Sequence, residues 1–148
     1  MREILDIAAI ICIGWMIGTE FAVSVFIGPV LDQLGPAKAK ATSLFAGRLG
    51  TAMPFWYILS LLFLIAETLL RRHESGVGLL ITATAIWVAV IVGTLFLLVP
   101  INNRIARSQS ETFSEKLQKE HRRWERLHRG RVALLAIAMV CLCVAIRG

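Results

Sequence analysis

The stretch Gly78–Ile101, GLLITATAIWVAVIVGTLFLLVPI, contains no charged residue. A bilayer core about 30 Å thick takes roughly 20 helical residues to cross, so this stretch is long enough to form a membrane span. Two other stretches reach that length, Ile7–Ile27 and, with helical flanks, Phe55–Leu70. A fourth, Val132–Ile146, is apolar over a shorter distance and cannot span on its own.

The composition supports a membrane protein rather than a soluble domain. The chain has 148 residues, of which 57% are hydrophobic and 18% charged, and its mean hydropathy is +0.71. We therefore predict an all-α fold, a four-transmembrane-helix bundle in a single integral membrane domain, 1–148. The predicted spans cover approximately residues 5–30, 53–71, 78–101 and 127–146, with an additional amphipathic, charged cytoplasmic helix before the fourth span.

The fourth span needs residues from the preceding RLHRGR to reach full length. This requirement draws His128 and Arg131 to the membrane boundary or below it. Trp124, His128 and Arg131 are spaced i, i+4, i+7 and so share one helical face. The alternative is that Trp124 is an interfacial anchor, His128 a solvated polar residue and Arg131 a snorkelling cation.

Glu20 lies just past the midpoint of the first span, where an ionised carboxylate is costly. We expect it to face the bundle interior and to be either protonated or paired. Ser24, one turn further on, shares its face. A functional role and a purely structural buried ion pair both remain open for Glu20.

The distribution of Lys and Arg predicts the orientation, because cytoplasmic loops carry the excess of basic residues. Most of the 16 basic residues fall between spans one and two or between spans three and four. These two loops are therefore predicted to be cytoplasmic and both termini outside, in the inner or plasma membrane of the cell. The net charge of +6 then reflects topology and attraction to membrane lipids, and nucleic acid is not an expected partner.

Three features of the connections and helix ends carry further expectations. Pro36 is placed where a short interfacial helix could begin. The sequence MPFWY opens span two and would put Trp56 and Tyr57 at headgroup level. A kink is possible at Gly130 on the way into span four.

Other polar and aromatic residues have simpler interpretations. Glu67 and Arg71 are four residues apart and predict an ion pair at a helix end. Trp15 and Trp87 lie deep in their spans and are most simply core aromatics. The three cysteines all lie within spans and predict neither a disulfide nor a metal site.

The predicted topology gathers the polar candidates at the cytoplasmic half of the bundle. A single Asn after a span can cap the last carbonyls, but two in succession are more than a cap requires. One carboxylate, one imidazole, one guanidinium and two carboxamides would line a cytoplasm-facing pocket. The residues concerned are Glu20, Ser24, Asn102, Asn103, His128 and Arg131.

Four sequence segments together resemble the anthrone oxygenase-like family of small four-helix membrane proteins, whose bacterial members are mostly known as a domain of unknown function. The segments are GTEFAVSVFIGPVL, MPFWY, VPINNRIA and RRWERLHRGRVALL. The resemblance implies oxidation of an activated anthrone carbon to a quinone by molecular oxygen, without a metal or other cofactor. The positions that match the family's signatures are Asn102, Asn103, Trp124, His128 and Arg131.

Such a reaction needs a base, donors for an oxyanion and a dry pocket for a lipophilic small molecule. We expect His128 to be the base, Arg131 and the two carboxamides to hold the oxyanion and Trp124 to form an aromatic wall. Glu20 would orient His128. The alternative is a non-enzymatic membrane module that binds a lipophile, assists a partner protein or moves a small solute, with the polar residues serving helix packing. A homo-oligomer is a further expected partner state.

Overall fold

The computed structural model describes residues 2–106 and 115–148, and these residues form helices and turns with no strand. Four helical segments are long and apolar enough to cross a membrane, which confirms the predicted all-α fold of a multi-pass membrane protein. Within them the structure divides into α1 (Arg2–Ala22), η1 (Val23–Ile27), α2 (Gly28–Asp32), η2 (Gly35–Ala37), α3 (Lys38–Leu70), α4 (Val77–Gly93), η3 (Thr94–Leu98), α5 (Val99–Ala106) and α6 (Glu115–Arg147).

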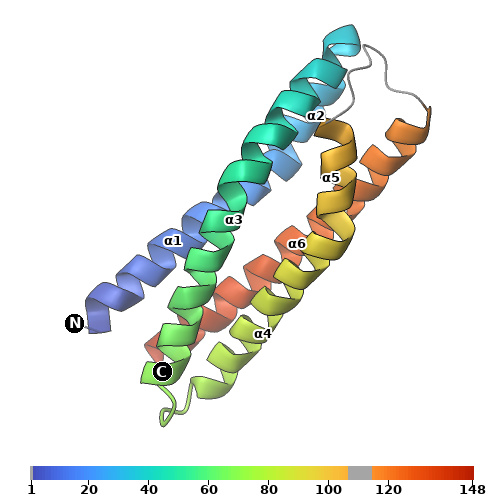
Figure 1. The fold of residues 1–148 in the computed structure, drawn as a ribbon. Helices are drawn as coiled ribbons and strands as arrows, with labels where there is room; N and C mark the ends of the chain where they lie inside the picture. Colours follow the sequence, from blue (N-terminus) through green and yellow to red (C-terminus); the bar gives the residue numbers. More distant parts are fainter. Residues whose placement is uncertain (1, 107–114) are drawn as a thin grey trace.

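The helices pack side by side as an elongated bundle (Figure 1), in which α4 packs on α6, and α3 contacts α1, α4 and α5. The α2–α3 turn and the end of α5 lie at one end of the bundle, and both termini lie at the other end with the α3–α4 turn. Two glycines permit the turns. Gly35 adopts a left-handed φ of 53°, and a Cβ on Gly76 would lie 2.9 Å from the carbonyl oxygen of Ala145.

Helices α3 and α6 are each 33 residues long and continue beyond the predicted spans. The expected interfacial helix after Pro36 is therefore wrong, because this segment is the first part of α3, whose inner side packs on α5. The charged helix expected before the fourth span is the first half of α6. It runs through Gly130 without interruption, since a single glycine lowers helix propensity by only about 1 kcal/mol.

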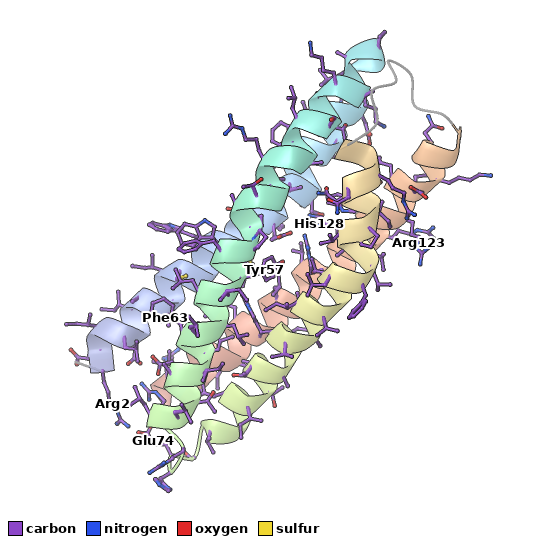
Figure 2. All side chains as sticks on the ribbon, viewed as in Figure 1. Arg2, Tyr57, Phe63, Glu74, Arg123 and His128 are labelled. Carbon is purple, nitrogen blue, oxygen red and sulfur yellow. The ribbon has the colours of Figure 1, made fainter. Side chains whose placement is uncertain are left out.

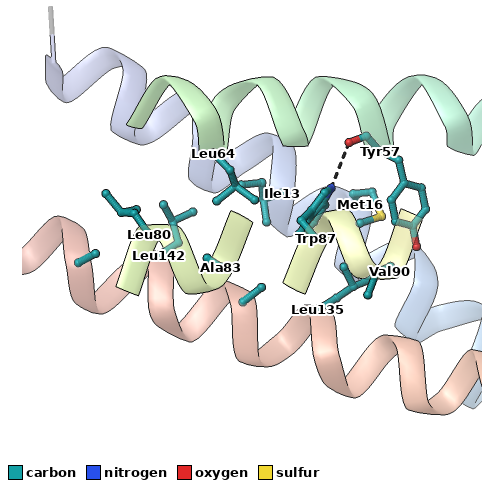
Figure 3. Close-up of a cluster of buried hydrophobic side chains, with 12 residues drawn as sticks. Ile13, Met16, Tyr57, Leu64, Leu80, Ala83, Trp87, Val90, Leu135 and Leu142 are labelled. Atoms are coloured by element: carbon teal, nitrogen blue, oxygen red, sulfur yellow. Dashed lines mark hydrogen bonds between the residues drawn. The ribbon is translucent and has the colours of Figure 1, made fainter. Parts of the chain in front are cut away.

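The apolar core fills the half of the bundle nearer the termini (Figure 3). Trp87 is fully buried there, as predicted, and its indole N–H donates to the backbone carbonyl of Tyr57 over 3.1 Å. Trp15, by contrast, is 67% exposed, so its expected core position is wrong. The outer surface of a membrane bundle faces lipid, and a large aromatic side chain therefore has no need to be inside.

In the half of the bundle farther from the termini, two helices change to π-helical geometry, α1 at η1 and α4 at η3. The π turn η1 is closed by Gly28 N–H donating to the Val23 carbonyl, and η3 by Val99 N–H donating to the Thr94 carbonyl. A proline, Pro29 or Pro100, is the second residue after each turn and has no N–H for the helical ladder. Such π turns are frequent at functional sites, and both of these border the cavity described next.

Candidate functional site

A cavity of about 430 Å³ lies between the first helical segment, α3, η3–α5 and α6. Most of its lining is apolar. Figure 2 shows Tyr57 on α3 and His128 on α6 near the middle of the bundle, where both side chains contribute to the cavity. The polar side chains of its wall include Glu20, Thr42, Tyr57, Thr94, Asn102, His128 and Arg131.

Glu20 is 3% exposed and is held by residues from two other helices. Its Oε1 accepts a hydrogen bond from the Tyr57 hydroxyl over 3.0 Å. Its Oε2 accepts one from Arg131 Nη2 over 2.5 Å and lies 3.2 Å from His128 Nδ1. The prediction that Glu20 faces the interior and has a partner is confirmed, and the partner is a cation that offsets the cost of burying a carboxylate.

His128 is 2% exposed, and both of its ring nitrogens have partners. Nε2 lies 3.1 Å from the backbone carbonyl of Glu20, which can only accept, so this nitrogen carries the proton. Nδ1 then accepts from Arg131 Nη2 over 2.8 Å. The ring also stacks on Trp124, with centroids 4.7 Å apart and an angle of 9° between the planes. His128 thus connects α6 to the backbone of α1 beside the carboxylate.

Arg131 contacts residues from three walls of the cavity, but one of its N–H groups has no hydrogen-bond partner among the described residues. Nη1 donates to the Thr94 hydroxyl over 3.2 Å, and the guanidinium carbon lies 5.6 Å from the centre of the Tyr57 ring. Within the described part of the chain, its Nε and the Thr42 hydroxyl are buried without a hydrogen-bond partner. Buried polar groups without partners are rare in proteins, and both of these residues line the cavity.

The other predicted site residues divide into two groups. Ser24, Trp124 and Asn102 line the cavity, and the Asn102 amide donates to the Ala46 carbonyl over 3.2 Å. Asn103 is exposed and does not line it. Consecutive helical residues point about 100° apart, and here the rotation from Asn102 to Asn103 turns the second side chain toward the exposed surface. The structure therefore brings together all the predicted site residues except Asn103.

Tyr57 is a site residue that the sequence did not identify. It was expected at headgroup level, but it is buried in the middle of α3, because this helix extends far beyond the start of the apolar stretch. The spacing of Tyr57, Ser60, Leu64 and Glu67, at i, i+3, i+7 and i+10, follows the buried face of α3. This spacing was the available signal for its burial.

A second group of buried charges lies near the termini and away from the cavity. Arg71 donates to both oxygens of Asp6, over 2.8 and 2.9 Å, to Glu67 over 3.2 Å and to Glu74 over 3.1 Å. The hydrogen bonds to Asp6 raise the pKa of Arg71 above its usual value. The predicted Glu67–Arg71 pair is confirmed, and it ties the end of α3 to α1.

A bundle of membrane-spanning helices that encloses a mostly apolar cavity with a buried carboxylate, imidazole and guanidinium is typical of an intramembrane small-molecule site. A family model described as anthrone oxygenase matches residues 42–141. This match covers most of the chain, and the chain belongs to the anthrone oxygenase family. It includes Tyr57, His128 and Arg131 but not Glu20. No curated protein and no solved structure matches the chain.

Proposed function

We propose that this protein is a membrane enzyme that oxidises a lipophilic aromatic molecule with molecular oxygen inside the cavity. The observation that carries the proposal is a buried Glu20–Arg131 pair on the wall of an apolar cavity, with a further Arg131 donor that has no partner among the described residues. The family to which the chain belongs supports an anthrone-like substrate. In the reaction, an activated CH₂ group and one O₂ give a ketone and one water.

The first step removes a proton from the activated carbon, and we assign Glu20 as the acceptor. The base role that the sequence assigned to His128 is less well supported, because both of its nitrogens have partners within the protein. Among the described residues, Glu20 Oε1 accepts one hydrogen bond, from Tyr57, and a carboxylate oxygen has room for another. His128 then acts as a positioning residue that holds the Glu20 backbone and Arg131.

Loss of the proton leaves a carbanion whose charge is shared with the ring oxygen of the substrate. Arg131 supplies the positive charge that stabilises this oxyanion, and its buried Nε is a donor without an acceptor among the described residues. The carbanion gives an electron pair to O₂ and, with the proton returned from Glu20, forms a hydroperoxide. The hydroperoxide loses water to give the ketone, so no external reductant is consumed.

The cavity suits a flat apolar molecule. Its volume of about 430 Å³ lies within the 300–1,000 Å³ that is usual for small-molecule sites. Trp124 offers an aromatic wall, and its ring is already stacked on the His128 ring. The Asn102 amide is a further polar group on the lining, near the end of the cavity formed by α5.

We further propose that the end of the bundle formed by the α2–α3 turn and the first half of α6 faces the cytoplasm of a cell with the protein in its inner or plasma membrane. Supporting this orientation are the basic residues concentrated at that end, including Lys38, Lys40 and Arg123. Cysteine substitutions at Lys40 and His73, at opposite ends, would react with an impermeant maleimide from opposite sides of the membrane. Labelling of both from the same side contradicts the orientation.

The test is oxygen uptake by the full chain in lipid vesicles supplied with an anthrone, at a mildly acidic pH where spontaneous oxidation is slow. We expect uptake above that of empty vesicles, with one quinone formed per O₂ and no hydrogen peroxide released. A folded, inserted His128→Ala protein should lose most of this uptake. Uptake equal to that of empty vesicles overturns the proposal and favours the non-enzymatic module, which mass spectrometry of co-purified lipophiles would then identify.

A further inference from the structure

A third polar cluster lies on the cavity wall, between the end of α2 and the first half of α6. It consists of Asp32, His121 and Glu125, and each offers one ligand atom within 4.8 Å of the other two. His121 Nε2 lies 3.3 Å from Glu125 Oε1 and 3.8 Å from Asp32 Oδ1. His121 is 7% exposed, and all three residues line the cavity.

These separations are close to those of a coordination sphere. Metal–nitrogen and metal–oxygen bonds of about 2.1 Å place neighbouring ligand atoms roughly 3.0–3.5 Å apart. The His121–Glu125 separation falls in this range, and Asp32 needs a movement of only about 1 Å, which side-chain rotation can supply. His121 and Glu125 are four residues apart on α6 and so already face the same way.

We propose that Asp32, His121 and Glu125 form a binding site for one first-row divalent metal ion. One imidazole and two carboxylates suit Mn²⁺, Fe²⁺, Co²⁺ or Zn²⁺, whereas Mg²⁺ and Ca²⁺ prefer oxygen ligands alone. Three protein ligands leave further coordination positions for water or for an oxygen atom of a molecule in the cavity. This site could not be predicted from the sequence, because Asp32 is far from His121 along the chain.

The metal site is distinct from the proposed proton-transfer group. Trp124 lies between His121 and His128 along α6, and its ring is nearly parallel to both, with centroids 6.3 Å and 4.7 Å away. His121 and His128 are seven residues apart on this helix, a rise of roughly 10 Å. The inference does not rest on the proposed oxidation, and its test measures metal binding alone.

The Lys38 ammonium group pairs with Asp32, where the metal ion would bind. Its Nζ lies 2.6 Å from Asp32 Oδ1, the same oxygen that faces His121. A divalent ion must displace this ammonium group, so binding by the native protein is weakened by competition. The competition makes a specific prediction, since removal of the Lys38 charge should strengthen metal binding rather than weaken it.

The experiment uses the full chain, purified without a histidine tag in lipid nanodiscs and stripped with a chelator. Titration with MnCl₂, followed by the electron paramagnetic resonance signal of free Mn²⁺, should show one bound ion per chain. Asp32→Asn and Glu125→Gln keep the side-chain shapes and should each weaken binding at least tenfold. Control variants at the far end, His73→Gln and Glu3→Gln, should leave it unchanged.

Two further arms make the result decisive. Lys38→Gln should bind Mn²⁺ several-fold more tightly, whereas Lys40→Gln, an exposed neighbour, should bind as the native protein does. Co²⁺ should give visible absorption bands that Glu125→Gln alters, independently of any activity. Absence of both Mn²⁺ and Co²⁺ binding, or binding that Asp32→Asn and Glu125→Gln leave unchanged, overturns the proposal.

Discussion

The molecule buries two glutamate–arginine pairs, and they differ in what surrounds them. Glu67 and Arg71 are one helical turn apart at the end of α3, and Arg71 also binds the carboxylates of Asp6 and Glu74. Glu20 and Arg131 are 111 residues apart in sequence and meet on the wall of the cavity. The first pair links helices at the end of the bundle, and the second lies on the wall of a space large enough for a small molecule.

The difference shows how one ion-pair chemistry can serve structure or function. Three carboxylates surround the Arg71 guanidinium, so its hydrogen bonds are made within the protein. Arg131 binds Glu20 and Thr94 but keeps a buried Nε without a partner in the described residues. A donor left unsatisfied inside a protein costs about 1–3 kcal/mol, which a ligand with an oxygen atom would recover.

The largest expected effect is on stability, from the loss of Arg131. Arg131→Met leaves Glu20 as a buried carboxylate without its cation, and this should lower the free energy of unfolding by about 3–5 kcal/mol. Unfolding in mixed micelles measures the change. The double variant Glu20→Gln/Arg131→Met should be more stable than Arg131→Met alone. Purely additive losses would mean that the two residues do not interact as the structure indicates.

Arg71→Met sharpens the contrast between the pairs. It should also destabilise the protein, because the Asp6 and Glu67 carboxylates then lose the Arg71 cation, while Glu74 keeps its ion pair with Arg2. Anthrone oxidation at a temperature where the variant is folded should nevertheless persist, since Arg71 does not line the cavity. Loss of oxidation in folded Arg71→Met would remove the distinction between a structural and a functional pair.

A smaller effect is expected from Tyr57→Phe, which removes the hydroxyl that donates to Glu20. The lost hydrogen bond should lower stability by about 1–2 kcal/mol and slow oxidation several-fold. The Trp87 hydrogen bond is unaffected, because it is made to the Tyr57 backbone. Ser60→Ala is the matched control, a buried hydroxyl one turn away that does not line the cavity, and its oxidation rate should match the native protein.

The smallest predicted difference is between two glycines of α3. A Cβ on Gly50 would lie 3.2 Å from the Asn102 amide nitrogen, whereas one on Gly47 would meet nothing within 4 Å. Gly47→Ala should stabilise the helix by up to about 1 kcal/mol. Gly50→Ala should gain less and should raise the KM for the anthrone, because Asn102 must move. Equal melting temperatures and KM values in both variants would place Asn102 outside the site.

The sequence identified the four residues of the two glutamate–arginine pairs through different signals. Apolar length located the spans, and the shortfall of the fourth span identified His128 and Arg131. The cost of a carboxylate in a span singled out Glu20, and i, i+4 spacing identified Glu67 with Arg71. Each of these inferences depends on local sequence and on the thickness of a bilayer.

Contacts between distant segments were not predictable in the same way. The sequence alone does not distinguish an aromatic residue at headgroup level from one that is buried within a longer helix, as Tyr57 is. Asp32 at the end of α2 lies 3.8 Å from His121 on α6, and no local pattern in the sequence encodes that approach. Asn103 matched a family signature, but its position on the helix directs it away from the cavity.

The most direct test of the account compares isosteric substitutions in the two pairs, Glu20→Gln and Glu67→Gln, by anthrone-dependent oxygen uptake in vesicles. Both variants lose one buried carboxylate charge, and thermal unfolding sets a temperature at which both are folded. We expect Glu20→Gln to lose about 99% of the native rate or more, the lower end of the contribution of a general base, and Glu67→Gln to keep most of it. Equal rates in the two variants would contradict the assignment of the Glu20–Arg131 cavity as the reaction site.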